Sequence, residues 1–308
     1  MGCLSPRLRA GGSSLTSFGV RRDTSIHARP RLYHNLRELQ SERVWLRSLT
    51  QAGIRVPVPV QAVDGRDYVP VPVSETGEIR YASLAHWIEG EIVADVVERS
   101  REPRLLESYY ARLGSIMGSM HNQASGWVPP ASFARHSLDA DGLMGNAPYW
   151  GPFWKNEFLS RDERDLLLRT RDVMYQRLAA CDRGPDTYSM IHADLHHNNL
   201  VVANNDVSVI DFDDCGLGWH QYDIAVAFFH CPAGVHSRAV ESAFLRSYRC
   251  IRPIPDEALR LVPMFKLIRG MAILGWMHQR PEVQLPDGMF EHIKAYVIRG
   301  CETFAASL

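Results

Sequence analysis

The chain contains very little lysine and has almost no net charge. Only three of its 34 basic residues are lysines, at Lys155, Lys266 and Lys294, so the first half of the chain has none. The formal net charge is −1 over 308 residues, which argues against a protein that binds nucleic acid through a large basic surface. Any mechanism that needs a cation near the N-terminus must therefore use arginine.

Long apolar runs and paired cysteines are missing as well. No run approaches the ~20 apolar residues that a membrane span requires, so we expect no membrane association. The six cysteines are scattered and include no Cys-x-x-Cys pair, which argues against a zinc knuckle or a disulfide framework. We therefore expect reduced thiols and a cytoplasmic protein.

Residues 1–30 differ in composition from the rest of the chain. The first 31 residues hold six arginines and a single acid, Asp23, among many glycines and serines. This composition fits a disordered tail, a transit peptide or a wrongly chosen start codon, and the sequence leaves these three open. We find no pair of alternating apolar runs in this segment and therefore expect it to lack a β-hairpin.

The remaining sequence predicts a small α+β part followed by a larger, mainly helical part. Asn35 and Glu38 form a capping box at the start of a helix, and short strands with proline, typical of sheet edges, follow between residues 56 and 88. Helical spacing of apolar residues dominates after that. We place the small part at residues 31–88 and the helical part at residues 89–308, in line with about two domains for this length.

A β-hairpin with polar ends is predicted near residue 205. Two four-residue apolar runs, at 200–203 and 207–210, flank a three-residue polar turn. If the inner ends of these runs face one another, Asn199 lies opposite Asp211, and opposed side chains share one face of the hairpin. Their amide and carboxylate oxygens suit Mg²⁺. Asp194, five residues before Asn199, can then lie beside that metal.

The residues around this hairpin resemble a known family. His192-Ala-Asp194, with Asn199 five residues beyond the aspartate and then Asp211-Phe, is similar to the catalytic loop and metal-binding motif of the protein-kinase-like fold. The run Ile-His-Ala-Asp-Leu-His, followed by Ile-Asp-Phe-Asp-Asp-Cys-Gly-Leu-Gly-Trp and Tyr-Asp-Ile-Ala, resembles the aminoglycoside phosphotransferase and choline kinase superfamily. The resemblance covers about residues 31 to 280.

The resemblance implies an α+β, two-lobed protein-kinase-like fold, with a small and incomplete N-lobe and a larger helical C-lobe. It also implies an enzyme that uses ATP and Mg²⁺ to phosphorylate a hydroxyl group of a small molecule, such as an aminoglycoside or an amino alcohol. By position, Asp194 would accept the proton of the acceptor hydroxyl. Asn199 and Asp211 would hold Mg²⁺ on the nucleotide phosphates.

The same resemblance assigns residues to the nucleotide side. The segment 41–46 resembles the N-lobe helix of the family, and Trp87-Ile88 with the following Glu-Gly resembles its hinge. Glu42 would pair with a basic residue on the preceding strand to orient the phosphates. Because no lysine is present there, the candidate is Arg31, which carries a forked, permanently charged group.

His192 and Asp223, near the catalytic motif, are expected to have structural roles. His192 is expected to pack and hydrogen-bond within the loop. Asp223 either braces the catalytic loop, as the resemblance implies, or is a helix-terminal carboxylate that the helix dipole favours. Trp150 and three other tryptophans either line an acceptor pocket or belong to the core.

Other functions remain open at this stage. A zinc-dependent hydrolase could use His192, Asp194, His196, His197 and Asp211. A protein Ser/Thr kinase of the same fold is a second alternative. A pseudokinase that only binds ligands is a third, because the N-lobe shows no hairpin to cover the phosphates. The acceptor and the oligomeric state are not readable from the sequence.

Overall fold

The computed structural model describes residues 16–21, 24–29, 34–72, 79–100, 102–232, 237–283 and 285–307. Arg31 lies outside these residues. The chain forms two compact units. The first holds residues up to Leu105 together with Trp127–Arg135 and Asn198–Asp213, and the second holds Leu106–Gly126, His136–His197 and Asp214–Leu308. Residues 198–213, which we expected in the helical part, therefore group with the first unit.

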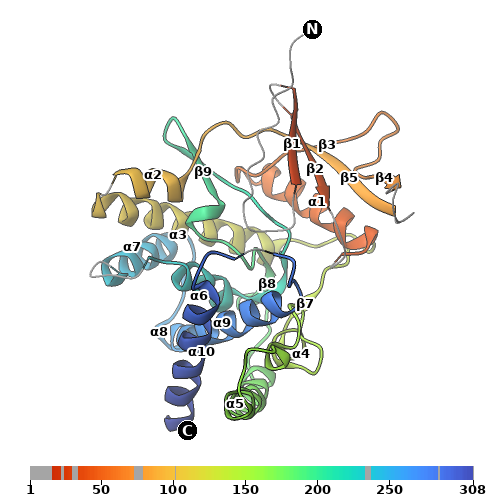
Figure 1. The fold of residues 1–308 in the computed structure, drawn as a ribbon. Helices are drawn as coiled ribbons and strands as arrows, with labels where there is room; N and C mark the ends of the chain where they lie inside the picture. Colours follow the sequence, from red (N-terminus) through yellow and green to blue (C-terminus); the bar gives the residue numbers. More distant parts are fainter. Residues whose placement is uncertain are drawn as a thin grey trace. The chain divides into compact units, whose positions relative to one another are not determined.

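The main sheet of the first unit contains five strands (Figure 1). The hairpin that we expected to be missing is present, and that expectation is wrong. The sheet pairs β5 with β2 on one side and with both β3 and β4 on the other, and β1 pairs antiparallel with β2. The sequence signal was weak because these two strands hold few apolar residues, whereas strand pairing itself needs only backbone groups. The strands are β1 (Thr16–Arg21), β2 (Thr24–Arg29), β3 (Pro59–Val60), β4 (Val69–Pro72) and β5 (Ile79–His86).

Helix α1 (Leu36–Gln51) begins where the capping box predicted. The Asn35 side chain accepts a hydrogen bond from the Glu38 N–H, and the Glu38 carboxylate accepts one from the Asn35 N–H. Apolar residues recur along this helix at helical spacing and form one buried stripe. The buried apolar residues are Leu39, Trp45, Leu46 and Leu49.

A small three-stranded sheet carries the predicted hairpin. It consists of β6 (Glu91–Ile92), β9 (Leu200–Ala203) and β10 (Asp206–Val209), with β9 in the centre. Pairing of β9 with β6 joins the hairpin to the first unit. Helix α2 (Val93–Ser100) follows β6 directly.

The second unit is mainly helical around a second small sheet of β7 (Ser137–Leu138), β8 (Tyr188–Ile191) and β11 (Gly216–Trp219). Its most buried helices are α6 (His220–Phe229) and α9 (Val262–His278), which pack together. None of the described helices is both long and apolar enough to cross a membrane. The other helical elements, some of them short, are α3 (Pro103–Gly126), α4 (Ala140–Met144), η1 (Phe153–Lys155), α5 (Arg161–Ala179), η2 (His197–Asn199), α7 (Ser237–Ile251), α8 (Asp256–Leu259) and α10 (Met289–Ala306).

Candidate active site

The hairpin forms, but its register differs by one residue from the expected one. Asp206 pairs with Ala203, so the turn contains only Asn204 and Asn205. Both asparagines have positive φ, at 46° and 72°, which is the conformation that a two-residue hairpin turn requires and that asparagine tolerates. Asn199 consequently lies opposite residue 210 rather than Asp211, so the predicted opposition of the two candidate metal ligands is wrong.

Asn199 and Asp211 nevertheless remain at the same open end of the hairpin. The Ile210 N–H donates to the Asn199 carbonyl at 3.0 Å, and Asp211 follows immediately. Asp211 has φ +64° and so leaves the strand geometry, while Phe212 packs edge-on against Trp45 with ring centroids 5.7 Å apart. An amide oxygen and a carboxylate are the hard donors that Mg²⁺ prefers, and the chemistry of this pair therefore fits the predicted metal.

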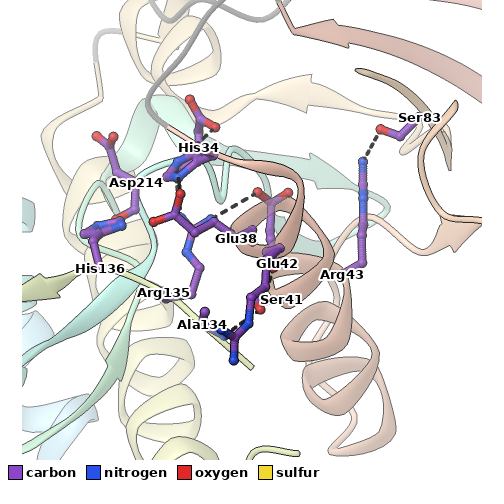
Figure 2. Close-up of polar contacts among 12 residues, drawn as sticks. His34, Glu38, Ser41, Glu42, Arg43, Ser83, Ala134, Arg135, His136 and Asp214 are labelled. Atoms are coloured by element: carbon purple, nitrogen blue, oxygen red, sulfur yellow. Dashed lines mark hydrogen bonds and ion pairs between the residues drawn. The ribbon is translucent and has the colours of Figure 1, made fainter. Parts of the chain in front are cut away.

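Arg135 forms hydrogen bonds both to helix α1 and to the segment after Asp211 (Figure 2). Its Nη2 donates to the Asp213 carbonyl at 2.6 Å, and its Nη1 donates to the Glu38 carbonyl at 3.3 Å. Glu42 is 3% exposed, and its Oε2 lies 3.9 Å from Arg135 Nη1. His34 Nε2 donates to the same Asp213 carbonyl at 2.8 Å. Within the first unit, Arg135 thus provides a cation for Glu42.

The Asp223 side chain accepts hydrogen bonds from the backbone of the catalytic loop. The fully buried carboxylate accepts the N–H of His192 at 3.2 Å and the N–H of Ala193 at 2.8 Å. Ala193 has φ +66°, a conformation that needs such support. The carboxylate also accepts from His121 Nε2 at 3.2 Å, and His121 Nδ1 accepts from the Tyr248 hydroxyl. Burial raises the pKa of Asp223 to about 6. This geometry matches the bracing role.

His192 also behaves as expected. It is fully buried, and its Nδ1 accepts a hydrogen bond from the Asp194 N–H at 3.3 Å.

The Asp194 carboxylate faces three basic side chains of the second unit. Arg269 Nη2 donates to its Oδ1, and His196 Nε2 lies 3.5 Å from the same oxygen. His230 accepts from Arg269 at 3.3 Å and stacks on His196 at 4.1 Å. Burial alone would raise the pKa of Asp194, but the charge of Arg269 and the hydrogen bond with His196 outweigh it and hold that pKa well below its usual range. The side chain keeps 19% exposure, so a substrate can reach an ionised carboxylate.

Comparison with known proteins identifies the family. The model of the phosphotransferase enzyme family matches residues 8–254. The chain belongs to this family. The Amicoumacin kinase of Bacillus subtilis (strain 168) is 23% identical over 256 residues, which cover 78% of this chain and 69% of the relative.

Solved structures agree with that assignment. The microcompartment-associated aminopropanol kinase is 28% identical with a TM-score of 0.80, over 98% of this chain and 93% of the other. The amicoumacin kinase hAmiN, in complex with AMP-PNP, Ca²⁺ and Ami, is 21% identical with a TM-score of 0.70, over 95% of this chain and 90% of the other. The predicted protein-kinase-like α+β fold and phosphotransferase class are thereby confirmed.

The geometry of this phosphotransferase does not favour the zinc hydrolase. Ligand atoms of Asp194, His196 and His230 do lie within 4.8 Å of one another. Arg269, however, bonds the carboxylate oxygen of that group and places a positive charge where a zinc ion would sit. Of the other expected ligands, His192 accepts from the loop backbone and His197 lies 3.4 Å from the Tyr110 hydroxyl.

The remaining predicted residues of the phosphotransferase are on the nucleotide side. Trp87 and Ile88 directly follow β5, and Trp87 is 47% exposed. Their contact with a nucleotide stays a prediction, as does the pairing of Glu42 with Arg31. Sequence reasoning missed Arg135, Arg269 and His230. All three come from segments far from the catalytic motif along the chain, and none belongs to a recognisable local pattern.

Proposed function

We propose that this phosphotransferase uses ATP and Mg²⁺ to phosphorylate a hydroxyl group of a small molecule. The observation that carries the proposal is the catalytic loop, in which Asp223 accepts the N–H groups of His192 and Ala193 and so supports the backbone next to the accessible Asp194 carboxylate. The relatives support it, since one is an aminopropanol kinase and the other an amicoumacin kinase complexed with AMP-PNP and Ca²⁺.

Asp194 would orient the acceptor hydroxyl and take up its proton, and its low pKa keeps it ionised at neutral pH. Asn199 and Asp211 would hold the metal ion. A bound Mg²⁺ would supply charge neutralisation on the nucleotide phosphates. Glu42, Arg31, Trp87 and Ile88 would contribute to the nucleotide side.

A small-molecule acceptor is favoured over a protein substrate, because the two relatives are an aminopropanol kinase and an amicoumacin kinase. The pseudokinase alternative depended on a missing N-terminal hairpin. Strands β1 and β2 remove that reason, because they form an antiparallel pair that continues the sheet through β5.

The test is ATP turnover with a panel of amino alcohols and hydroxy amino acids. We expect Asp194→Ala and Asp211→Ala to lose at least ~10²-fold in kcat, the range typical of a lost catalytic acid or base. Asp206→Ala is the matched control, because Asp206 lies in the same hairpin, is 56% exposed and forms an ion pair with the exposed Arg55. Unchanged turnover in both active-site variants would refute the assignment.

A further inference from the structure

Two buried N–H donors near the catalytic carboxylate, Arg269 Nε and Trp150 Nε1, have no hydrogen-bond partner among the described residues. The buried Tyr222 hydroxyl lies with them and interacts with the Arg269 side chain. Arg269, Trp150 and Tyr222 are 6%, 3% and 0% exposed. An unsatisfied buried polar group costs roughly 1–3 kcal/mol, so two of them in one place need a functional explanation.

These donors form one cluster with Asp194. Arg269 donates to Asp194 through Nη2, and its guanidinium carbon lies 5.7 Å from the centroid of the Trp150 ring. The Trp150 and Tyr222 rings stack with centroids 6.0 Å apart and an interplanar angle of 20°. All four residues belong to the second unit, so the arrangement lies within a single compact body.

Two glycines allow the backbone around Trp150 to pack against helix α9. A Cβ atom on Gly275 of α9 would lie 2.4 Å from the Gly151 carbonyl oxygen and 3.0 Å from that of Trp150. Only glycine therefore lets this loop pack directly on the helix that carries Arg269. Gly151 itself has φ +98°, a conformation that L side chains rarely adopt.

The chemistry of the cluster selects its ligand. The N–H groups of arginine and tryptophan can only donate, and the tyrosine hydroxyl can donate as well, so the complementary group must present acceptor oxygens. Arg269 already pairs with Asp194 through Nη2, and its unpartnered Nε–H can give a charge-assisted hydrogen bond to an oxygen of the ligand. The neighbouring His230 adds no charge, because burial lowers its pKa well below the usual value. Asp214 also acts on Arg269 electrostatically, and negative charge near the cluster favours an acceptor that also carries an ammonium group.

We propose that Arg269, Tyr222 and Trp150 bind a carboxylate of the acceptor, so that this site phosphorylates hydroxy acids, above all hydroxy amino acids. The inference rests on the proposed function and names its substrate class. In the reaction, the acceptor oxygen forms a bond to the γ-phosphorus while the bond from that phosphorus to the β,γ-bridging oxygen breaks. ADP leaves with the electron pair, and the hydroxyl proton passes to Asp194.

Matched acceptors test the role of the carboxylate directly. Threonine and 1-amino-2-propanol differ only by that group, as do serine and ethanolamine. We expect wild-type kcat/KM to be at least ~10-fold higher for the hydroxy amino acid in one pair or both, because a charge-assisted hydrogen bond contributes roughly that factor. Arg269→Gln should bring the ratio within each pair close to one, and Tyr222→Phe, which removes a single hydroxyl, should lower it less.

The control for loss of a buried arginine is Arg252→Gln. Arg252 is 8% exposed and bonds Asn122 and Asp186 in the same unit, so this variant should retain the wild-type ratio. Circular dichroism and thermal melting identify variants that fail to fold. If Arg269→Gln fails to fold, the ratio for Tyr222→Phe still decides.

Calorimetry separates this inference from the proposed function. Binding of threonine that weakens in Arg269→Gln, without phosphorylation of any acceptor, would support the carboxylate site and contradict the kinase. Phosphorylation of the amino alcohols at equal or higher kcat/KM, with ratios that Arg269→Gln leaves unchanged, would overturn the carboxylate site and leave the kinase intact. An equal fall of kcat for both members of each pair, with the ratio kept, would also overturn it.

Discussion

The two units hold their active-site segments with buried charged residues of opposite sign. In the second unit, the Asp223 carboxylate accepts the N–H groups of residues 192 and 193. In the first unit, the Arg135 guanidinium donates to the carbonyl groups of residues 213 and 38. Both side chains are at most 8% exposed. One unit thus fixes a loop through backbone donors and the other fixes a loop through backbone acceptors.

This difference gives the two attachments different sensitivities to pH. A carboxyl group can lose its charge, and burial has already raised the pKa of Asp223 to about 6. A guanidinium keeps its charge at any ordinary pH. The catalytic loop should therefore respond to pH, whereas the Arg135 attachment should not.

The largest effect is expected from Asp223→Ala. It leaves the N–H groups of His192 and Ala193 and the Nε2 of His121 without this acceptor, so we expect the unfolding free energy to fall by about 4 kcal/mol. Turnover should fall with it, because the position of Asp194 depends on this loop. Asp223→Asn keeps one acceptor oxygen, so its unfolding free energy and turnover should lie between those of wild type and Asp223→Ala. Urea unfolding measures both, and a loss below about 1 kcal/mol in the alanine variant would contradict the bracing role.

The pH response is the next largest. Because the folded-state pKa of Asp223 lies above the unfolded value of about 4, its contribution to stability is complete below pH ~4 and is lost as pH rises through about 6. The advantage of wild type over Asp223→Asn should therefore narrow by up to about 3 kcal/mol between pH 4 and 7. His121, whose pKa burial lowers to about 3, changes the stability of both proteins with pH in the same direction, so it cancels in this difference. The difference in unfolding free energy between wild type and Arg135→Met should not change with pH. If the difference changed with pH equally for Arg135→Met and Asp223→Asn, the two attachments would not differ in their sensitivity to pH.

Arg135→Met should have a smaller effect that falls mainly on the nucleotide. The change removes two donors to backbone carbonyls and the cation beside Glu42, for a loss of about 2 kcal/mol. Because α1 and the segment after Asp211 would lose the Arg135 link and keep the His34 hydrogen bond, we expect KM for ATP–Mg²⁺ to rise several-fold more than KM for the acceptor. Arg135→Lys keeps the charge but not the forked guanidinium, so this variant should lose less stability and raise KM for ATP–Mg²⁺ less than Arg135→Met. Equal changes in the two KM values would show a merely structural role.

The comparison also shows what the sequence could reveal. Asp194, Asn199 and Asp211 lie within 18 residues of one another, and the capping box that begins at Asn35 is a signal four residues long, so a local pattern was enough to find them. Arg135 contacts a residue 78 positions away, and Arg269 contacts one 75 positions away. Such contacts depend on the complete fold and leave no local periodicity. The predicted hairpin register is wrong for a different reason. The prediction places Asp206 in the turn, whereas Asp206 pairs with Ala203 and belongs to β10.

The smallest predicted effect concerns that turn, which sets the place of Asn199 relative to Asp211. Asn205 has φ +72°, so Asn205→Gly should leave stability unchanged within a few tenths of a kcal/mol, since glycine adopts this conformation freely. Asn205→Val should cost about 1 kcal/mol, because a β-branched residue is strained there. Urea unfolding with ATP turnover would check both variants. If valine were tolerated without loss, the two-residue turn would not be what fixes the register, and the attachment at Asp213 would have to do so alone.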